Sequence, residues 1–332
     1  MKNKYAIILL TMIAACVAVG CRQQVITDDM DDREKLEVLD RQIEKHPDDA
    51  SLLAQRAQVL MNLGRSKEAS YDINKAVKNT PDNDRYLMLQ ADIYFANGDV
   101  SNSYAALSAA EKIAPNSMEV QLKMGELTFY NRDYDRSLKH LTNVTDKEPD
   151  NRTALFMKGY IYKEMGDTAS AVTLLRKVCD LYPDYEPAFE ELGILYATHH
   201  DPMAVEYLST ALRLEPSNTN AMYALAMFYQ ETGDVEQAEE LYHKMIDINE
   251  NSADAWHNLG YIELFHYRDY GRAIDYLNKA TEADGSHLAA WANLGCAYEL
   301  NNQPQEARRA FETALELDAS YQPALDGLKR LK

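Results

Sequence analysis

Apolar and polar positions repeat along this chain with a period of 34 residues. Prolines mark the period, since they lie 34 and finally 33 residues apart at Pro47, Pro81, Pro115, Pro149, Pro183 and Pro216. When this proline is numbered position 32, apolar side chains recur at positions 4, 7, 11 and 24. Such spacing is typical of amphipathic helices. Gly-Asp pairs at 98–99, 166–167 and 233–234 suit the end of one helix and the start of the next. The pattern therefore predicts two helices, A and B, in each period.

Two further positions hold only small side chains. Position 8, on helix A, is Ala57, Ala91, Gly125, Gly159, Gly193, Ala226, Gly260 and Gly295. Position 20, on helix B, shifted by one residue in the two repeats of unequal length, is Ala69, Ser103, Ser137, Ala171, Ala204, Ala238, Ala273 and Ala307. Small residues allow two helices to approach closely, so each A helix is expected to pack against its own B helix at these positions.

The last two periods carry a known signature. Trp256-His257-Asn258-Leu259-Gly260 and Trp291-Ala292-Asn293-Leu294-Gly295 both fit W-x2-L-G, and the later positions of the signature are filled by Tyr298, Ala307, Phe311 and Ala314. With the 34-residue period, these residues make the chain similar to the tetratricopeptide-repeat (TPR) family. The resemblance implies an all-α, right-handed superhelical solenoid of about eight helix-turn-helix units plus flanking helices.

The repeat array is predicted to extend over residues 32–332. A lone helix at 32–46 precedes the units, and a capping helix at 322–332 follows them. The units are 50–83, 84–117, 118–151, 152–185, 186–218, 219–252, 253–287 and 288–321. Unit 253–287 is one residue longer than the period, and the extra residue is expected in the turn around Tyr267 to Gly271. Glu263 stands where the TPR family usually has tyrosine.

The first twenty residues are predicted to be a lipoprotein signal peptide. Lys2 and Lys4 precede an uncharged apolar run from Tyr5 to Gly20, which is too short for an ordinary transmembrane helix. The run ends in Ala18-Val19-Gly20-Cys21, which resembles the lipobox of bacterial lipoproteins. The resemblance implies that residues 1–20 are removed, that Cys21 is acylated, and that residues 21–31 form a lipidated tether.

Two alternatives to this assignment stay open. A second box, Ile13-Ala14-Ala15-Cys16, would lipidate Cys16, but cleavage before Cys21 leaves polar Arg22-Gln23-Gln24 next to the lipid. An uncleaved membrane anchor is the other alternative. The lipoprotein resemblance implies export to a Gram-negative envelope, at the outer membrane, on its periplasmic or surface face. Asp167-Thr168-Ala169 resembles the O-glycosylation sequence of Bacteroidetes secreted proteins.

In the TPR family the A helices line an inner groove that holds protein partners. In this chain the groove is expected at positions 2, 5, 6, 9, 12 and 13 of each unit. Aromatic side chains commonly anchor interfaces. The candidate groove residues are mainly apolar or aromatic: Leu89, Phe95, Leu122, Glu126, Phe129, Tyr130, Phe156, Tyr160, Tyr223, Met227, Tyr261 and Phe265, with Met88 and Leu264 as further members.

The net charge of the chain and its lack of catalytic and ligand-binding motifs argue against several classes of function. The chain has 34 Lys plus Arg against 53 Asp plus Glu, a formal charge of −19. Nucleic acid needs a basic footprint and is not expected. The sequence has no phosphate loop, nucleophile elbow or metal-ligand spacing, so no catalytic residue, cofactor, metal or small-molecule substrate is expected. No unit pairs Lys at position 5 with Asn at position 9, the residues with which TPR co-chaperones hold a C-terminal carboxylate.

The sequence therefore predicts a non-catalytic, lipid-anchored scaffold that binds peptide or helical segments of protein partners. A basic or aromatic peptide is mildly favoured, because acidic side chains are frequent at the inner positions. The alternative is a fixed structural subunit of an envelope assembly or secretion machine.

Overall fold

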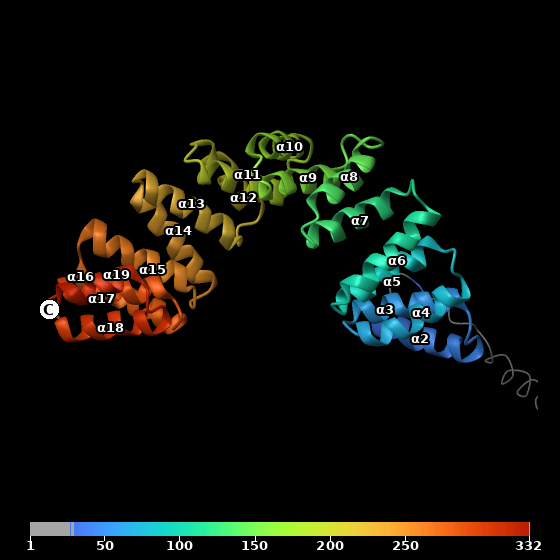
Figure 1. The fold of residues 1–332 in the computed structure, drawn as a ribbon, viewed down its shortest axis with the longest axis horizontal. Coiled ribbons are helices and arrows are strands. Elements are labelled where there is room, and N and C mark those ends of the chain that lie inside the picture. Colours follow the sequence, from blue (N-terminus) through green and yellow to red (C-terminus); the bar gives the residue numbers. More distant parts are fainter. Residues whose placement is uncertain (1–26, 28–29, 332) are drawn as a thin grey trace, which may run out of the picture. The chain divides into compact units, whose positions relative to one another are not determined.

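The computed structural model describes residue 27 and residues 30–331, and every regular element within that part of the chain is a helix (Figure 1). The predicted signal peptide, Cys16 and Cys21 lie outside the described residues. The chain divides into two compact units, the first ending at Pro149 and the second beginning at Asp150. None of the described helices is long and apolar enough to cross a membrane.

The first unit consists of a lone helix followed by three helix pairs. The lone helix is α2 (Asp32–Lys45). The A and B helices of the pairs are α3 (Ala50–Asn62) with α4 (Ser66–Asn79), α5 (Asp84–Ala96) with α6 (Val100–Ile113), and α7 (Met118–Tyr130) with α8 (Tyr134–Thr145).

The second unit consists of five helix pairs and a final helix, α19 (Gln322–Arg330). The pairs are α9 (Arg152–Glu164) with α10 (Thr168–Leu181), α11 (Glu186–Thr198) with α12 (Met203–Leu214), α13 (Thr219–Thr232) with α14 (Val235–Ile248), α15 (Ala253–Ile262) with α16 (Tyr270–Ala283), and α17 (Leu288–Leu300) with α18 (Pro304–Leu317). The prediction of an all-helical repeat fold with about eight helix pairs and flanking helices is confirmed.

The Gly-Asp turns have a simple physical basis. Gly98 and Gly166 have positive φ values of 78° and 79°, which glycine adopts without the strain that a side chain would cause. The aspartate that follows caps the B helix: Asp99 Oδ1 accepts a hydrogen bond from Asn102 N, and Asp167 Oδ1 accepts one from Ser170 N. These turns therefore end one helix and start the next within three residues.

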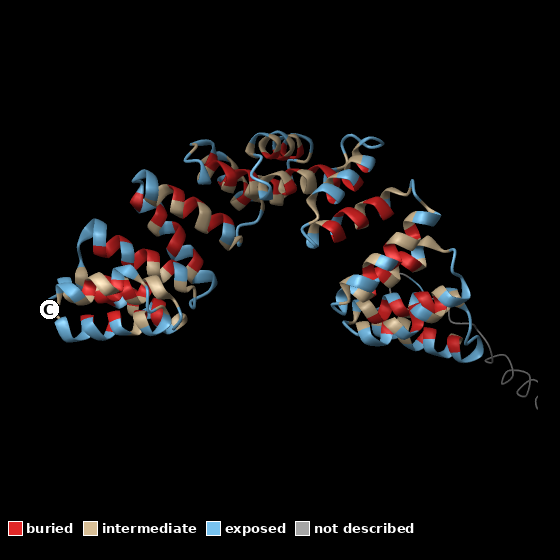
Figure 2. Ribbon diagram, viewed as in Figure 1, coloured by how far each residue is buried: buried red, intermediate tan, exposed pale blue. Residues whose placement is uncertain are grey.

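The core of each unit lies between facing helices (Figure 2). Where position 8 of helix A is glycine, it rests on the residue at position 24 of helix B, one position earlier in the shortened unit 186–218 and one position later in the lengthened unit 253–287. In α11, a Cβ built on Gly193 would lie 2.6 Å from Leu208 Cγ and 3.0 Å from the Leu208 backbone nitrogen. Gly260 has the same relation to Leu277. Glycine at these positions therefore sets the distance between the two helices of a pair.

The change Gly193→Ala is expected to destabilise the second unit by about 1–3 kcal/mol, because the new methyl group meets backbone as well as side chain. In an uncrowded helix the same change would be stabilising. Gly271→Ala in α16 is the matched control, since its Cβ would meet only Asp269 Oδ1, at 3.5 Å. Urea unfolding followed by circular dichroism measures both variants. Equal midpoints for the two would contradict the close packing at Gly193.

The expected place of the extra residue in unit 253–287 was wrong. The residue is accommodated before the turn, where the end of helix A widens into a π-helix, η1 (Glu263–Tyr267). Glu263 is fully buried there, and burial raises the pKa of its carboxyl group. Its oxygens accept no well-aligned hydrogen bond, but Arg272 Nη2 lies 2.8 Å from Oε1. Charge attraction to Arg272 therefore holds the carboxylate at a position that is leucine or tyrosine in most other repeats.

Candidate partner-binding site

The predicted groove residues of the first unit lie on its A helices, and none of these residues is fully buried. Phe95 on α5 and Tyr130 on α7 are 40% and 62% exposed. Their rings contact each other edge to face, with centroids 4.9 Å apart. Leu89, Leu122 and Phe129 are half-buried and Glu126 is exposed. Phe95 and Tyr130 thus form an aromatic patch across two successive A helices.

The groove residues of the second unit are also accessible. Phe156 and Tyr160 on α9 are half-buried, and Phe156 contacts the ring of Tyr185 edge to face at 5.3 Å. Tyr261 and Phe265 are 39% and 49% exposed, with ring centroids 4.6 Å apart. Tyr223 and Met227, on α13, are half-buried.

Two further sequence candidates belong to the core instead. Met88 is 4% exposed and packs with the buried residues of α5, α6 and α7. Leu264 is 1% exposed, because it lies in the π-helix. The wider turn rotates the side chains that follow Glu263 toward the interior. These two residues cannot contact a partner.

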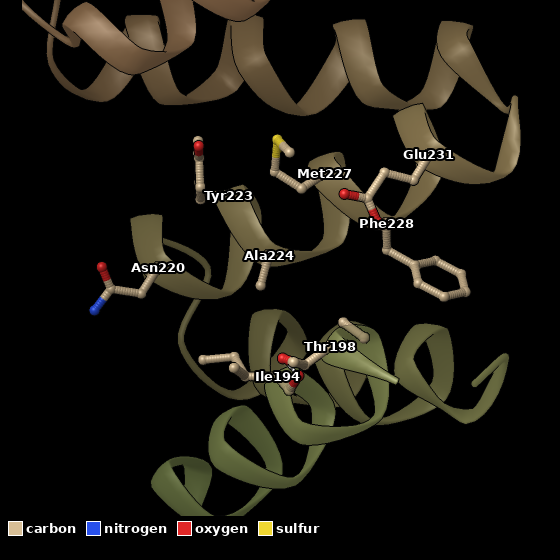
Figure 3. A pocket seen from close by; sticks show the side chains of 9 residues that line it. Ile194, Thr198, Asn220, Tyr223, Ala224, Met227, Phe228 and Glu231 are labelled. Atoms are coloured by element: carbon tan, nitrogen blue, oxygen red, sulfur yellow. Dashed lines mark hydrogen bonds between the residues drawn. The ribbon is translucent and has the colours of Figure 1, made fainter. Parts of the chain in front are cut away.

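A cavity of about 430 Å³ lies between α11 and α13 in the second unit (Figure 3). Ile194 and Thr198 on α11 face Ala224 on α13 across it. Every lining residue except Phe228 occupies one of the positions expected for the groove. The lining consists of Ile194, Ala197, Thr198, Asn220, Tyr223, Ala224, Met227, Phe228 and Glu231. We call this the α11–α13 cavity.

Sequence reasoning selected Tyr223 and Met227 but missed most of the other lining residues. The signal that could have found them is the pair of alanines, Ala197 at position 12 and Ala224 at position 6 of the next unit. Small side chains on facing positions leave a space that larger ones would fill.

Acidic side chains stand near both ends of the α11–α13 cavity. Glu231 is part of the lining, and at the other end Asn218 Nδ2 donates hydrogen bonds to Glu186 Oε1 at 2.8 Å and Glu190 Oε2 at 3.1 Å. Burial raises the pKa of Glu186. Glu191 is paired with Lys163, although burial raises its pKa as well. The surroundings of the cavity are therefore acidic.

Models of the tetratricopeptide repeat match residues 54–117, 122–186, 204–260, 253–287 and 288–321. The chain belongs to the tetratricopeptide-repeat family. Proteins with TPR repeats generally bind other proteins or peptides and serve as scaffolds.

Individual TPR proteins are similar to the chain either in sequence, over part of its length, or in three-dimensional fold. Superkiller protein 3 of Schizosaccharomyces pombe is 30% identical over 140 residues, which are 40% of this chain and 10% of that protein. The chain thus spans about a tenth of the length of the curated relatives it matches. Among solved structures, part of a TPR protein from Cytophaga hutchinsonii has a TM-score of 0.60 at 18% identity, over 74% of this chain and 99% of that one. A TPR protein from Parabacteroides merdae has a TM-score of 0.55 at 16% identity, over 75% and 98%. These structures show the fold alone.

The two cysteine thiols of the TPR array are buried or half-buried, and its possible metal ligands are not grouped together. Burial raises the pKa of the Cys179 thiol to about 12, and it raises the pKa of the half-buried Cys296. A thiol with a raised pKa is a poor nucleophile near neutral pH. Across residues 30–331 no group of three His, Cys, Asp or Glu side chains is placed to hold a metal ion.

A histidine pair links two A helices of the TPR array. The rings of His257 on α15 and His287 at the start of α17 have centroids 4.7 Å apart. Asn293 Nδ2 lies 2.9 Å from His257 Nε2. Burial, and secondly the neighbouring His287, lower the pKa of His257 to about 4. The folded protein therefore favours neutral His257.

The second unit is expected to lose stability between pH about 6.5 and pH about 4. As the pH falls, the unfolded chain protonates His257 near the ordinary histidine pKa, before the folded protein does. The stabilising contribution is thus present above pH about 6.5 and lost as the pH falls toward 4. The urea midpoint of the wild type should fall further over this range than that of His257→Gln, and parallel curves would contradict the prediction. His243→Gln, at an exposed position on α14, is the matched control.

Proposed function

We propose that the chain is a non-catalytic scaffold that binds segments of protein partners along the A helices. The observation that carries this proposal is the α11–α13 cavity, whose lining coincides with the positions where TPR proteins contact partners. The half-buried and exposed aromatic residues on neighbouring A helices support it, because aromatic side chains commonly anchor interfaces. Nucleic acid is not a proposed partner, since the chain carries a formal charge of −19.

Site-specific photo-crosslinking in cells tests the scaffold proposal. A benzophenone amino acid in place of Tyr223 should crosslink to a partner protein, whereas the same substitution at Glu240, exposed on the B helix α14, should not. A fixed structural subunit of an envelope machine would crosslink through α14 as well. Absence of any crosslink at Tyr223, and at Phe95 and Phe265 in parallel, would remove the support for partner binding.

We also propose that the scaffold is exported and held at the outer membrane by lipid on Cys21. The support is the sequence of the segment, with its charged start, uncharged run and Ala18-Val19-Gly20-Cys21. Several acyl chains hold a protein far more firmly than one chain, which gives only marginal binding. Such an anchor would leave the helix pairs free to bind partners beside the membrane.

Replacing Cys21 with serine should move the protein from the membrane fraction to the soluble fraction. The reason is that serine cannot form the thioether that carries the diacylglycerol. Cys16→Ser is the matched control and should leave the protein in the membrane fraction. Ultracentrifugation of cell lysates followed by immunoblotting measures both. Retention of Cys21→Ser together with release of Cys16→Ser would assign the lipid to the other cysteine.

A further inference from the structure

The walls of the α11–α13 cavity are apolar where the two helices face each other. Ile194, Met227 and Phe228 line it together with the aromatic residue Tyr223. Ala197 and Ala224 create the space between them. An apolar side chain that enters such a space loses contact with water and gains contact with the walls. The cavity is therefore built for a hydrophobic side chain and not for a charged one.

The groups around the cavity carry negative charge that no lysine or arginine neutralises. Among the ion pairs of residues 30–331, Lys163 is paired with Glu191, and neither Lys nor Arg lies within 4.0 Å of Glu186, Glu190 or Glu231. Among the basic side chains of the described residues, only His200 approaches Glu231, with its Nδ1 atom 3.4 Å from the carboxylate.

Both acidic positions lie beside the apolar walls. Glu190 precedes Ile194 by one helical turn on the same face of α11. Glu231 lies one turn after Met227 on α13. A segment whose apolar side chain fills the cavity would thus have carboxylates within reach on either side.

We infer that the α11–α13 cavity takes one aliphatic or aromatic side chain from a basic segment of a protein partner, with lysine or arginine flanking that side chain. This inference rests on the proposed scaffold function and names the class of partner. Flanking cations would meet Glu190 at one end and Glu231 at the other, in charge-assisted hydrogen bonds. An acidic segment, or a chain terminus that offers a carboxylate, would meet like charges at both ends and be repelled.

Selection of random peptides on the purified full chain tests the inference without a known partner. A displayed library of about twelve-residue peptides is passed over the immobilised protein near pH 7.5, at an ionic strength where surface charges still act. We expect enriched peptides to share one apolar residue flanked by lysine or arginine. Enrichment of acidic or uncharged peptides, or no enrichment at all, would overturn the inference.

Filling the cavity should weaken this binding. Ala224→Trp places an indole in the space, while Ala169→Trp, at an exposed position on α10, is the matched control. Affinity of a selected peptide, measured by fluorescence anisotropy, should fall about 10- to 100-fold in Ala224→Trp, the factor that a lost hydrophobic side-chain contact implies. Ala169→Trp should bind as the wild type does. Equal affinity in the two variants would remove the cavity from the site.

If Ala224→Trp fails to fold, as judged by circular dichroism, the milder Ala224→Leu replaces it and the same comparison holds.

The requirement for acidic side chains is tested by the double variant Glu190→Gln with Glu231→Gln, which should weaken peptide binding about 2- to 10-fold and reduce the dependence of binding on salt. Unchanged affinity and salt dependence would overturn the charge part. Absence of crosslinks at Tyr223, Phe95 and Phe265 together in cells would reject the scaffold function itself. A retained crosslink with no basic peptide selected would reject only the present inference.

Discussion

Replacing Phe311 with alanine is expected to destabilise the second unit by about 3–5 kcal/mol, the usual loss for a buried phenylalanine. Phe311 on α18 is fully buried. Its ring is enclosed by two glycines: a Cβ on Gly295 of α17 would lie 2.5 Å from Phe311 Cε1, and a Cβ on Gly327 of α19 would lie 2.4 Å from Cζ. The truncation would therefore leave a cavity shared by three helices.

Urea unfolding followed by circular dichroism measures the effect of Phe311→Ala. Phe265→Ala is the matched control, because that ring is 49% exposed and loses little contact on truncation. Hydrogen exchange should show the loss first in α19, since Phe311 and Gly327 join this helix to α18. A midpoint for Phe311→Ala as high as that for Phe265→Ala would mean that α17 and α19 do not depend on the ring.

Replacing Arg56 with methionine is expected to destabilise the first unit by about 3 kcal/mol, the lower end of the range for breaking a buried ion pair. Arg56 on α3 donates to both carboxylate oxygens of Asp72 on α4, at 2.7 and 2.8 Å, and to Asp40 on α2 at 2.7 Å. Asp72 is only 1% exposed. Without the guanidinium its charge would be buried and unpaired.

The comparison variant for Arg56→Met is Arg65→Met, which breaks an exposed pair with Glu68 and should leave the urea midpoint unchanged. A second variant, Arg56→Met with Asp72→Leu, should recover most of the lost stability, because it removes the buried charge together with its partner. If the double variant is no more stable than the single one, the loss comes from packing around Arg56 and not from the unpaired carboxylate.

The sequence predicted the repeat fold well because the fold depends on local, recurring constraints. A glycine or alanine at position 8 and a small residue at position 20 are required wherever two helices approach closely, so they recur in every pair. The Gly-Asp turns are equally local, since Gly98 and Gly166 provide the positive φ and the next aspartate caps a helix. Such constraints can be recognised one repeat at a time.

The features that escaped prediction involve contacts that differ from one repeat to another. Arg56 occupies position 7, which is apolar in the general pattern, and its role depends on Asp40 and Asp72 in two other helices. The α11–α13 cavity is lined by two small side chains, Ala197 and Ala224, that belong to successive pairs. Leu264 turns inward because the helix around it is a π-helix. Each outcome depends on combinations of residues that no single position reveals.

The two irregular repeats show how this protein tolerates changes in length. The repeat at 186–218 is one residue shorter than the 34-residue period, and the repeat at 253–287 is one residue longer. Both differences fall between the A helix and the B helix of the repeat. The α11–α13 cavity lies on the opposite kind of boundary, between A helices of successive pairs. A change in length at the end of an A helix thus alters the groove positions beside it, as at Leu264, and leaves the boundary between the A helices α11 and α13 in place, so that repeat length can vary without loss of the cavity.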